Sequence, residues 1–86
     1  MAEDDATIAW LALEPGTPIL ASDGVEIGRV ATVVADEQKD IFSGVTFRPG
    51  LLGGERFVPA DSIDRLTSSA VHLTITEAEA AKLAEY

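Results

Sequence analysis

The longest run of β-branched and apolar residues in the chain lies at positions 25–35. It follows Asp23-Gly24, a strong signal for a two-residue hairpin turn, because that turn needs positive φ, which Gly accepts freely and Asp tolerates. We therefore expect the apolar segment 18–21 to pair antiparallel with the strand that begins at Val25.

The apolar positions of this run change parity after Ile27. Val25 and Ile27 fall at odd-numbered positions, whereas Val30 and Val34 fall at even-numbered ones. A β-bulge centred on Gly28 would bring both pairs to the same face of the strand. Because bulges bend and twist a strand, we expect this one to form the curved spine of a small barrel.

Strand 41–48 is predicted to follow the polar turn at 36–40. Its residues Ile41, Val45 and Phe47 share one parity and are expected to face the core.

Three shorter strands are predicted further along the chain. Strand 55–59 ends at a proline, which cannot donate to a sheet ladder, and strand 63–66 follows a tight turn. Strand 71–75 alternates, with its apolar residues facing inward and His72 facing outward.

The N-terminal segment is expected to be a disordered tail over residues 1–6, because charge clusters there without large apolar groups. A single domain would then span residues 7–86. Its first segment, 7–13, fits either a short strand or one helical turn, and Pro15-Gly16 ends it in both cases.

The C-terminal segment is predicted to be helical over residues 77–85. Thr76 and Glu79 have the spacing of a capping box, and Glu77 and Glu79 lie in the first turn, where the helix dipole favours negative charge. So short a helix is not stable alone in water, so we expect it to dock on the barrel as a lid over one end.

Composition narrows the function classes. The 86 residues include no Cys, which excludes disulfides and thiolate metal sites. The formal charge of −9 repels phosphate backbones and anionic membrane surfaces, so direct nucleic-acid binding is disfavoured. The acidic N-terminus lacks a signal-peptide pattern and no apolar run reaches the ~20 residues of a membrane span, which indicates a cytoplasmic protein.

No set of residues has the spacing of a catalytic or metal site. His72 is the only histidine, and no carboxylate or nucleophile is expected beside it, so we interpret it as a solvent-facing strand residue. Arg48 and Arg56 flank a glycine-rich loop, for which an ordinary hairpin loop is favoured over an anion-binding nest. We expect no enzymatic activity, no cofactor and no metal.

Four apolar residues are candidate partner contacts, because so small a core does not guarantee them a place: Trp10, Phe42, Leu51 and Leu52. Phe42 is expected on the outward face of its strand. The two leucines either fold back over the barrel mouth or stay exposed for a partner. A homodimer would cover these residues, but −9 on each copy opposes it, so a second copy and another protein both remain open as partners.

Several short motifs follow one another along most of the chain, from about residue 16 to residue 75. They are Pro-Gly-Thr-Pro-Ile at 15–19, Ser-Asp-Gly-Val-Glu-Ile-Gly-Arg-Val at 22–30, Ile-Phe-Ser-Gly-Val at 41–45, Arg-Phe-Val-Pro-Ala-Asp at 56–61 and Val-x-Leu at 71–73. In this order they resemble the PRC-barrel family. With the trailing helix, the chain is similar to small stand-alone bacterial members.

This resemblance implies a mainly β fold, a small six-stranded PRC-type β-barrel with a short C-terminal α-helix. The barrels of the photosynthetic reaction-centre H subunit and of a maturation factor for the small ribosomal subunit are protein-docking modules without catalytic residues to transfer. We therefore expect a non-enzymatic protein-interaction or scaffold module. The alternative is an accessory factor in ribosome assembly or RNA processing that acts through protein contacts.

Overall fold

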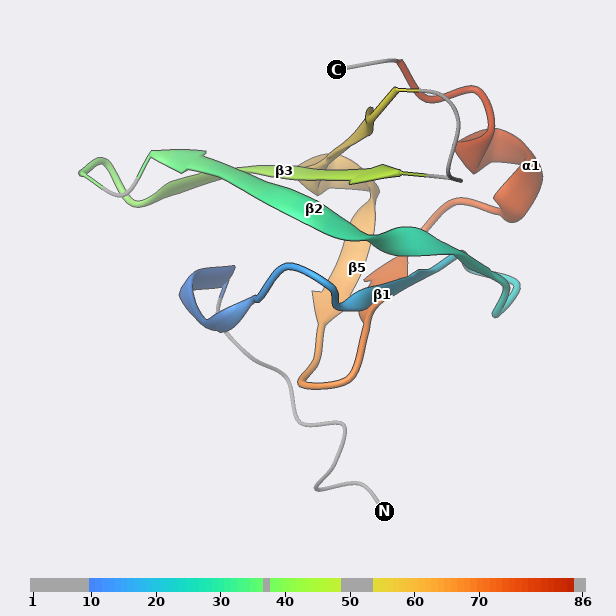
Figure 1. The fold of residues 1–86 in the computed structure, drawn as a ribbon, viewed down its shortest axis with the longest axis horizontal. Helices are drawn as coiled ribbons and strands as arrows, with labels where there is room; N and C mark the ends of the chain where they lie inside the picture. Colours follow the sequence, from blue (N-terminus) through green and yellow to red (C-terminus); the bar gives the residue numbers. More distant parts are fainter. Residues whose placement is uncertain (1–9, 37, 49–53, 85–86) are drawn as a thin grey trace.

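The computed structural model describes residues 10–36, 38–48 and 54–84. Its strands form one six-stranded mixed sheet in the order β4-β3-β2-β1-β6-β5 (Figure 1). The strands are β1 (Pro18–Leu20), β2 (Glu26–Asp36), β3 (Ile41–Arg48), β4 (Arg56–Pro59), β5 (Ile63–Leu66) and β6 (Val71–Leu73). A 3-10 turn, η2 (Trp10–Ala12), precedes the sheet, and a short helix, α1 (Glu77–Ala80), follows it.

The mainly β class and the short C-terminal helix agree with the sequence-based expectation. The expected closure into a barrel is not seen as strand pairing, because the ladder ends at β4 and β5 within the described ranges. The 3-10 turn η3 (Ala60–Ser62) connects these two end strands. The pairing of β1 with β6 is parallel and joins the two ends of the domain, which no local pattern predicted.

The hairpin between β1 and β2 is confirmed, but its turn differs from the expected one. The amide of Gly24 donates to the carbonyl of Ala21 at 2.9 Å, and the amide of Ala21 donates to the carbonyl of Val25 at 2.9 Å. The loop therefore has three residues, 22–24, and only its last, Gly24, has positive φ, at 87°. This is the geometry of a three-residue hairpin loop with glycine in the left-handed position.

The predicted bulge in β2 is present next to Gly28. Ile19 pairs with Gly28 and Leu20 pairs with Glu26, so Ile27 is the extra residue. A Cβ on Gly28 would lie 2.9 Å from the carbonyl oxygen of Arg48. Glycine is therefore required here because β3 approaches the backbone closely.

A second bulge, in β3, overturns two predictions. Ser43 is an extra residue opposite the step from Val34 to Ala35, and it reverses the parity of the strand before it. The prediction that Ile41 faces the core is wrong, because Ile41 is 50% exposed. The prediction that Phe42 faces outward is also wrong, because Phe42 is half-buried and packs against the core.

A third bulge lies in β2 at Ala31, since Val30 pairs with Phe47 and Thr32 pairs with Thr46. Because one residue is added, Val33 packs against the core where the sequence pattern predicted Val34. The core thus follows the bulges rather than a strict alternation. Its buried members are Leu13, Ile19, Val30, Val45, Phe47, Val58, Leu66, Val71 and Leu73.

Helix α1 begins as predicted and ends early. The capping box is formed, with the Thr76 amide donating to Glu79 Oε1 at 2.8 Å and the Glu79 amide donating to Thr76 Oγ1 at 3.2 Å. The prediction of a helix through residue 85 is wrong, because α1 ends at Ala80. The chain beyond it binds β4, whose Phe57 amide donates to the carbonyl of Ala84 at 3.0 Å.

The start of the described chain resolves one open alternative. Residues 10–12 form a helical turn, not a strand. The predicted tail, 1–6, lies outside the described residues. Within the described ranges, no helix is long and apolar enough to cross a membrane.

Candidate functional site

Two hollows with different chemistry lie at opposite ends of β2. One contains Val33 and the other contains Ile27. Val33 follows Ile27 by six positions along the extended chain, which corresponds to about 20 Å. The two hollows are therefore independent candidates for a binding site.

The first hollow belongs to what we call the aromatic patch, formed by Trp10, Leu11, Val33, Ala35 and Phe42. The rings of Trp10 and Phe42 stack, with centroids 6.0 Å apart and planes inclined by 11°. A cavity of about 150 Å³ lies beside Trp10. Leu11 is 64% exposed, so the patch presents a large apolar side chain to solvent.

Two local features build this patch. The amide of Leu13 donates to the carbonyl of Trp10 at 3.1 Å and closes η2, while the buried Leu13 side chain anchors it to the core. The bulge at Ser43 turns Phe42 toward the core side of β3, where it meets Trp10. The structure thus brings together two of the four predicted contact residues. The other two, Leu51 and Leu52, lie outside the described residues.

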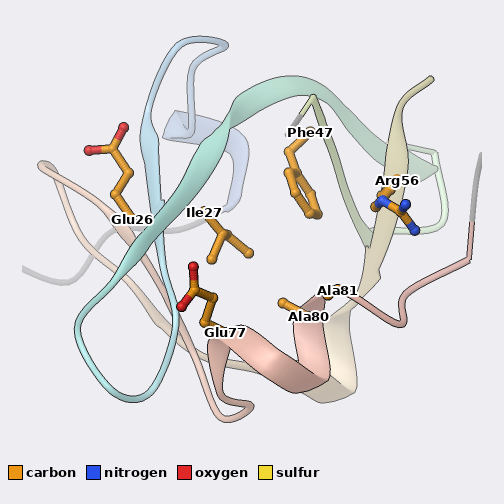
Figure 2. A pocket seen from close by; sticks show the side chains of 7 residues that line it. All are labelled: Glu26, Ile27, Phe47, Arg56, Glu77, Ala80 and Ala81. Atoms are coloured by element: carbon orange, nitrogen blue, oxygen red, sulfur yellow. The ribbon is translucent and has the colours of Figure 1, made fainter. Parts of the chain in front are cut away.

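The second hollow, which we call the α1 cleft, has a volume of about 320 Å³ and lies between α1 and the sheet (Figure 2). Figure 2 shows Ile27, Phe47 and Ala80 around its centre, Glu77 on one side and Arg56 on the other. The lining residues are Glu26, Ile27, Phe47, Arg56, Glu77, Ala80 and Ala81.

Sequence reasoning missed the α1 cleft, although the predicted docking of the C-terminal helix was a signal for it. Residues 26, 56 and 77 meet only through the fold. Arg56 Nη1 donates to the carbonyl of Leu83 at 2.7 Å, which holds the guanidinium at the edge of β4. Glu26 pairs with Arg29 at 3.6 Å in an exposed ion pair, which contributes at most about 1 kcal/mol.

His72, which was considered as a catalytic or metal-binding residue, lies next to a hydroxyl that stabilises a turn. His72 Nε2 lies 3.5 Å from Thr67 Oγ1, and that buried hydroxyl also donates to the carbonyl of Ala70 at 3.0 Å, within the turn before β6. The Thr67 hydroxyl therefore stabilises the turn, and the His72 ring lies beside that hydroxyl.

The two arginines considered for an anion nest contact other groups. Arg48 pairs with Glu55 at 3.6 Å, and Arg56 binds Leu83. Residues 49–53 of the intervening loop lie outside the described chain. Across the described ranges, no three His, Asp or Glu side chains are grouped so that they could hold a metal ion.

Neither a protein-family model nor a curated protein matches this chain.

Proposed function

We propose that this chain is a non-enzymatic protein-interaction module that docks a partner on the aromatic patch. The observation that carries the proposal is the stacked pair of Trp10 and Phe42 with the exposed Leu11 beside it. Aromatic side chains are enriched at protein interfaces, where they supply large contact areas at low entropic cost.

The geometry of the patch favours a macromolecular partner over a small ligand. Its cavity of about 150 Å³ is smaller than the pockets of about 300 to 1,000 Å³ that hold small molecules. Fully burying an exposed Leu side chain stabilises a complex by about 2 kcal/mol. The patch therefore offers an exposed apolar anchor with a shallow hollow beside it, which suits contact with the surface of another protein.

We further propose that the fold is of PRC-barrel type. Support comes from the motif order and from extra residues in the strands, at Ile27, Ala31 and Ser43 in the central hairpin and at Asp64 in β5. Such bulges give a sheet the curvature that a barrel needs. The short η3 connection between the end strands also favours curling of the sheet toward closure.

A matched pair of variants tests the docking function. Leu11→Asp places a charge in the aromatic patch, where Leu11 is 64% exposed. Ile41→Asp places one at an apolar residue that is 50% exposed and is not part of the patch. Each variant is used as bait in a native lysate and sedimented alone at high micromolar concentration in moderate salt. Self-association or partner capture should be lost in Leu11→Asp and kept in Ile41→Asp.

Trp10 gives a direct readout, because it is the only Trp in the chain. Its emission should shift when the partner or second copy binds, and the shift should vanish in Leu11→Asp. Equal capture and equal sedimentation by wild type and Leu11→Asp, with both folded by circular dichroism, would overturn the proposal.

A further inference from the structure

The α1 cleft combines an apolar floor with opposite charges on its two sides (Figure 2). Phe47 is 2% exposed and Ala80 is 3% exposed, so the floor is held by the core itself. The small side chain of Ala80, opposite Ile27, leaves the space open. At about 320 Å³, the cleft lies at the small end of ligand-binding cavities, with room for a side chain and its adjoining backbone.

The charges on the two sides are available to a ligand. A guanidinium has five N–H donors, and the structure shows one hydrogen bond from Arg56, to the carbonyl of Leu83. Among the described residues, neither Arg56 nor Glu77 takes part in an ion pair. Glu26 adds a second carboxylate to the lining.

We propose that the α1 cleft binds a peptide segment of a partner protein in which an apolar residue lies between a basic and an acidic residue. The apolar side chain packs on Ile27, Phe47 and Ala80. The basic group faces Glu77, and the carboxylate receives hydrogen bonds from Arg56, a geometry in which guanidinium–carboxylate pairs are strong. Complementary charges at both ends fix the orientation of the segment.

Other ligand classes fit this lining less well. A phosphate-rich ligand would bring negative charge to Glu26 and Glu77 in a chain whose net charge is already −9. A purely apolar ligand would cover Arg56 without offering it an acceptor, which costs desolvation energy. The proposal does not rest on the aromatic patch, which lies at the other end of β2.

The test uses the blocked tripeptide Lys-Leu-Glu, together with Glu-Leu-Lys, because the segment can run in either direction. Both are titrated into the ¹⁵N-labelled full chain. One of the two should shift the amide signals of Ile27 and Ala81 with a Kd of about 1 mM, the range expected for so small a ligand. Lys-Ser-Glu and Glu-Leu-Glu should each bind at least about 5-fold more weakly, because each lacks one element of the recognised pattern.

Three variants locate the binding. Ala81→Leu, at an exposed residue of the cleft, should weaken binding about 10-fold by narrowing the cleft, and Glu77→Gln should weaken it about 3- to 10-fold. Glu14→Gln makes the same change of charge away from the cleft and should leave the Kd unchanged. Thermal melts confirm that all three variants are folded.

The proposal is overturned if Lys-Ser-Glu binds as well as both leucine peptides, if neither leucine peptide binds, or if Ala81→Leu retains the wild-type Kd. The emission of Trp10 should stay constant throughout the titration. A peptide that shifts the Trp10 emission without shifting Ile27 binds the aromatic patch, and that result also counts against the cleft.

Discussion

The β2–β3 hairpin has two ends that differ in their surroundings. At the base, β1 pairs with β2 up to Arg29, and β4 pairs with β3 from Gly44 to Phe47. Toward the tip, the described residues add no further strand on either side, and η2 supplies the cover. In Figure 1 this end of the hairpin extends away from α1 and beyond β1.

Burial follows this difference. Val30, Val45 and Phe47 at the base are 3% exposed or less, whereas Ile41 at the tip is 50% exposed and Phe42 is half-buried. A core-facing residue on a strand that pairs with neighbours on both sides is buried by the rest of the sheet. A residue with one neighbouring strand keeps surface that a partner can cover. We therefore expect base mutations to change stability, and mutations in the aromatic patch beside the tip to change binding.

The largest effect is expected for Gly44→Ala, where the base begins. The added Cβ would overlap the carbonyl oxygen of Val58, a backbone atom that cannot rotate away. The β3–β4 pairing must shift, and we expect a loss of about 3 kcal/mol in the free energy of unfolding, measured by urea denaturation. Gly54→Ala is the control, since a Cβ there has no neighbour within 4 Å among the described residues. Equal stability of the two variants would show that close packing of β3 against β4 does not stabilise the base of the hairpin.

Gly28→Val comes next. The new side chain would approach both the Phe47 ring, at 2.8 Å, and the Arg48 carbonyl oxygen, at 2.9 Å. The ring can adjust in part, so we expect a loss of about 2 kcal/mol and a lower melting temperature. A melting temperature equal to that of wild type would show that Gly28 does not set the approach of β2 to β3.

Thr76→Ala tests the contribution of α1 to the base. The substitution removes the hydroxyl that accepts from the Glu79 amide, and the loss of an N-cap costs about 1 kcal/mol. Thr76→Ser keeps the hydroxyl and should stay close to wild type. If Thr76→Ala and Thr76→Ser denature at the same urea concentration, the capping box does not hold α1 on the sheet.

Leu11→Asp should have the smallest effect on stability. Because Leu11 is exposed on η2, we expect a change within about 0.5 kcal/mol, alongside the loss of binding described above. A loss of binding without a loss of stability would distinguish Leu11 from the residues at the base, where mutations change stability. A cooperative loss of stability above 1 kcal/mol would assign Leu11 to the core and remove it from the proposed docking surface.

The sequence pattern predicted one of the three bulges in β2 and β3 and missed the other two. The bulge near Gly28 was predictable because the parity of the apolar positions changes there within a few residues. The bulge at Ser43 was not, because Val45 and Phe47 continue the parity of Ile41 without a break. Only the pairing of β3 with β2 shows that Phe42 takes the core side.

The two candidate sites also differ in how much of each the sequence indicated. Trp10 and Phe42 were selected individually as apolar residues without an assured place in the core, and their contact is a result of the fold. The α1 cleft had no local signature, because its residues come from four separate segments, in β2, β3, β4 and around α1.

The sequence by itself determined the features that depend on neighbours a few residues apart. These are the approximate positions of the strands, the hairpin between β1 and β2, the helical start at Thr76 and the mainly β class. The last strand was predicted over residues 71–75, but β6 ends at Leu73. Each of these features follows from a local alternation, a turn residue or a cap whose energy does not depend on the rest of the chain.

The tertiary structure decided the parallel pairing of β1 with β6, the early end of α1 and the burial of Phe42. Each depends on contacts between distant segments. The carbonyls of Leu83 and Ala84 accept hydrogen bonds from donors on β4, and those donors lie more than twenty residues away in the sequence. Backbone groups bind whichever partner the fold brings within reach, so a local pattern cannot specify these contacts.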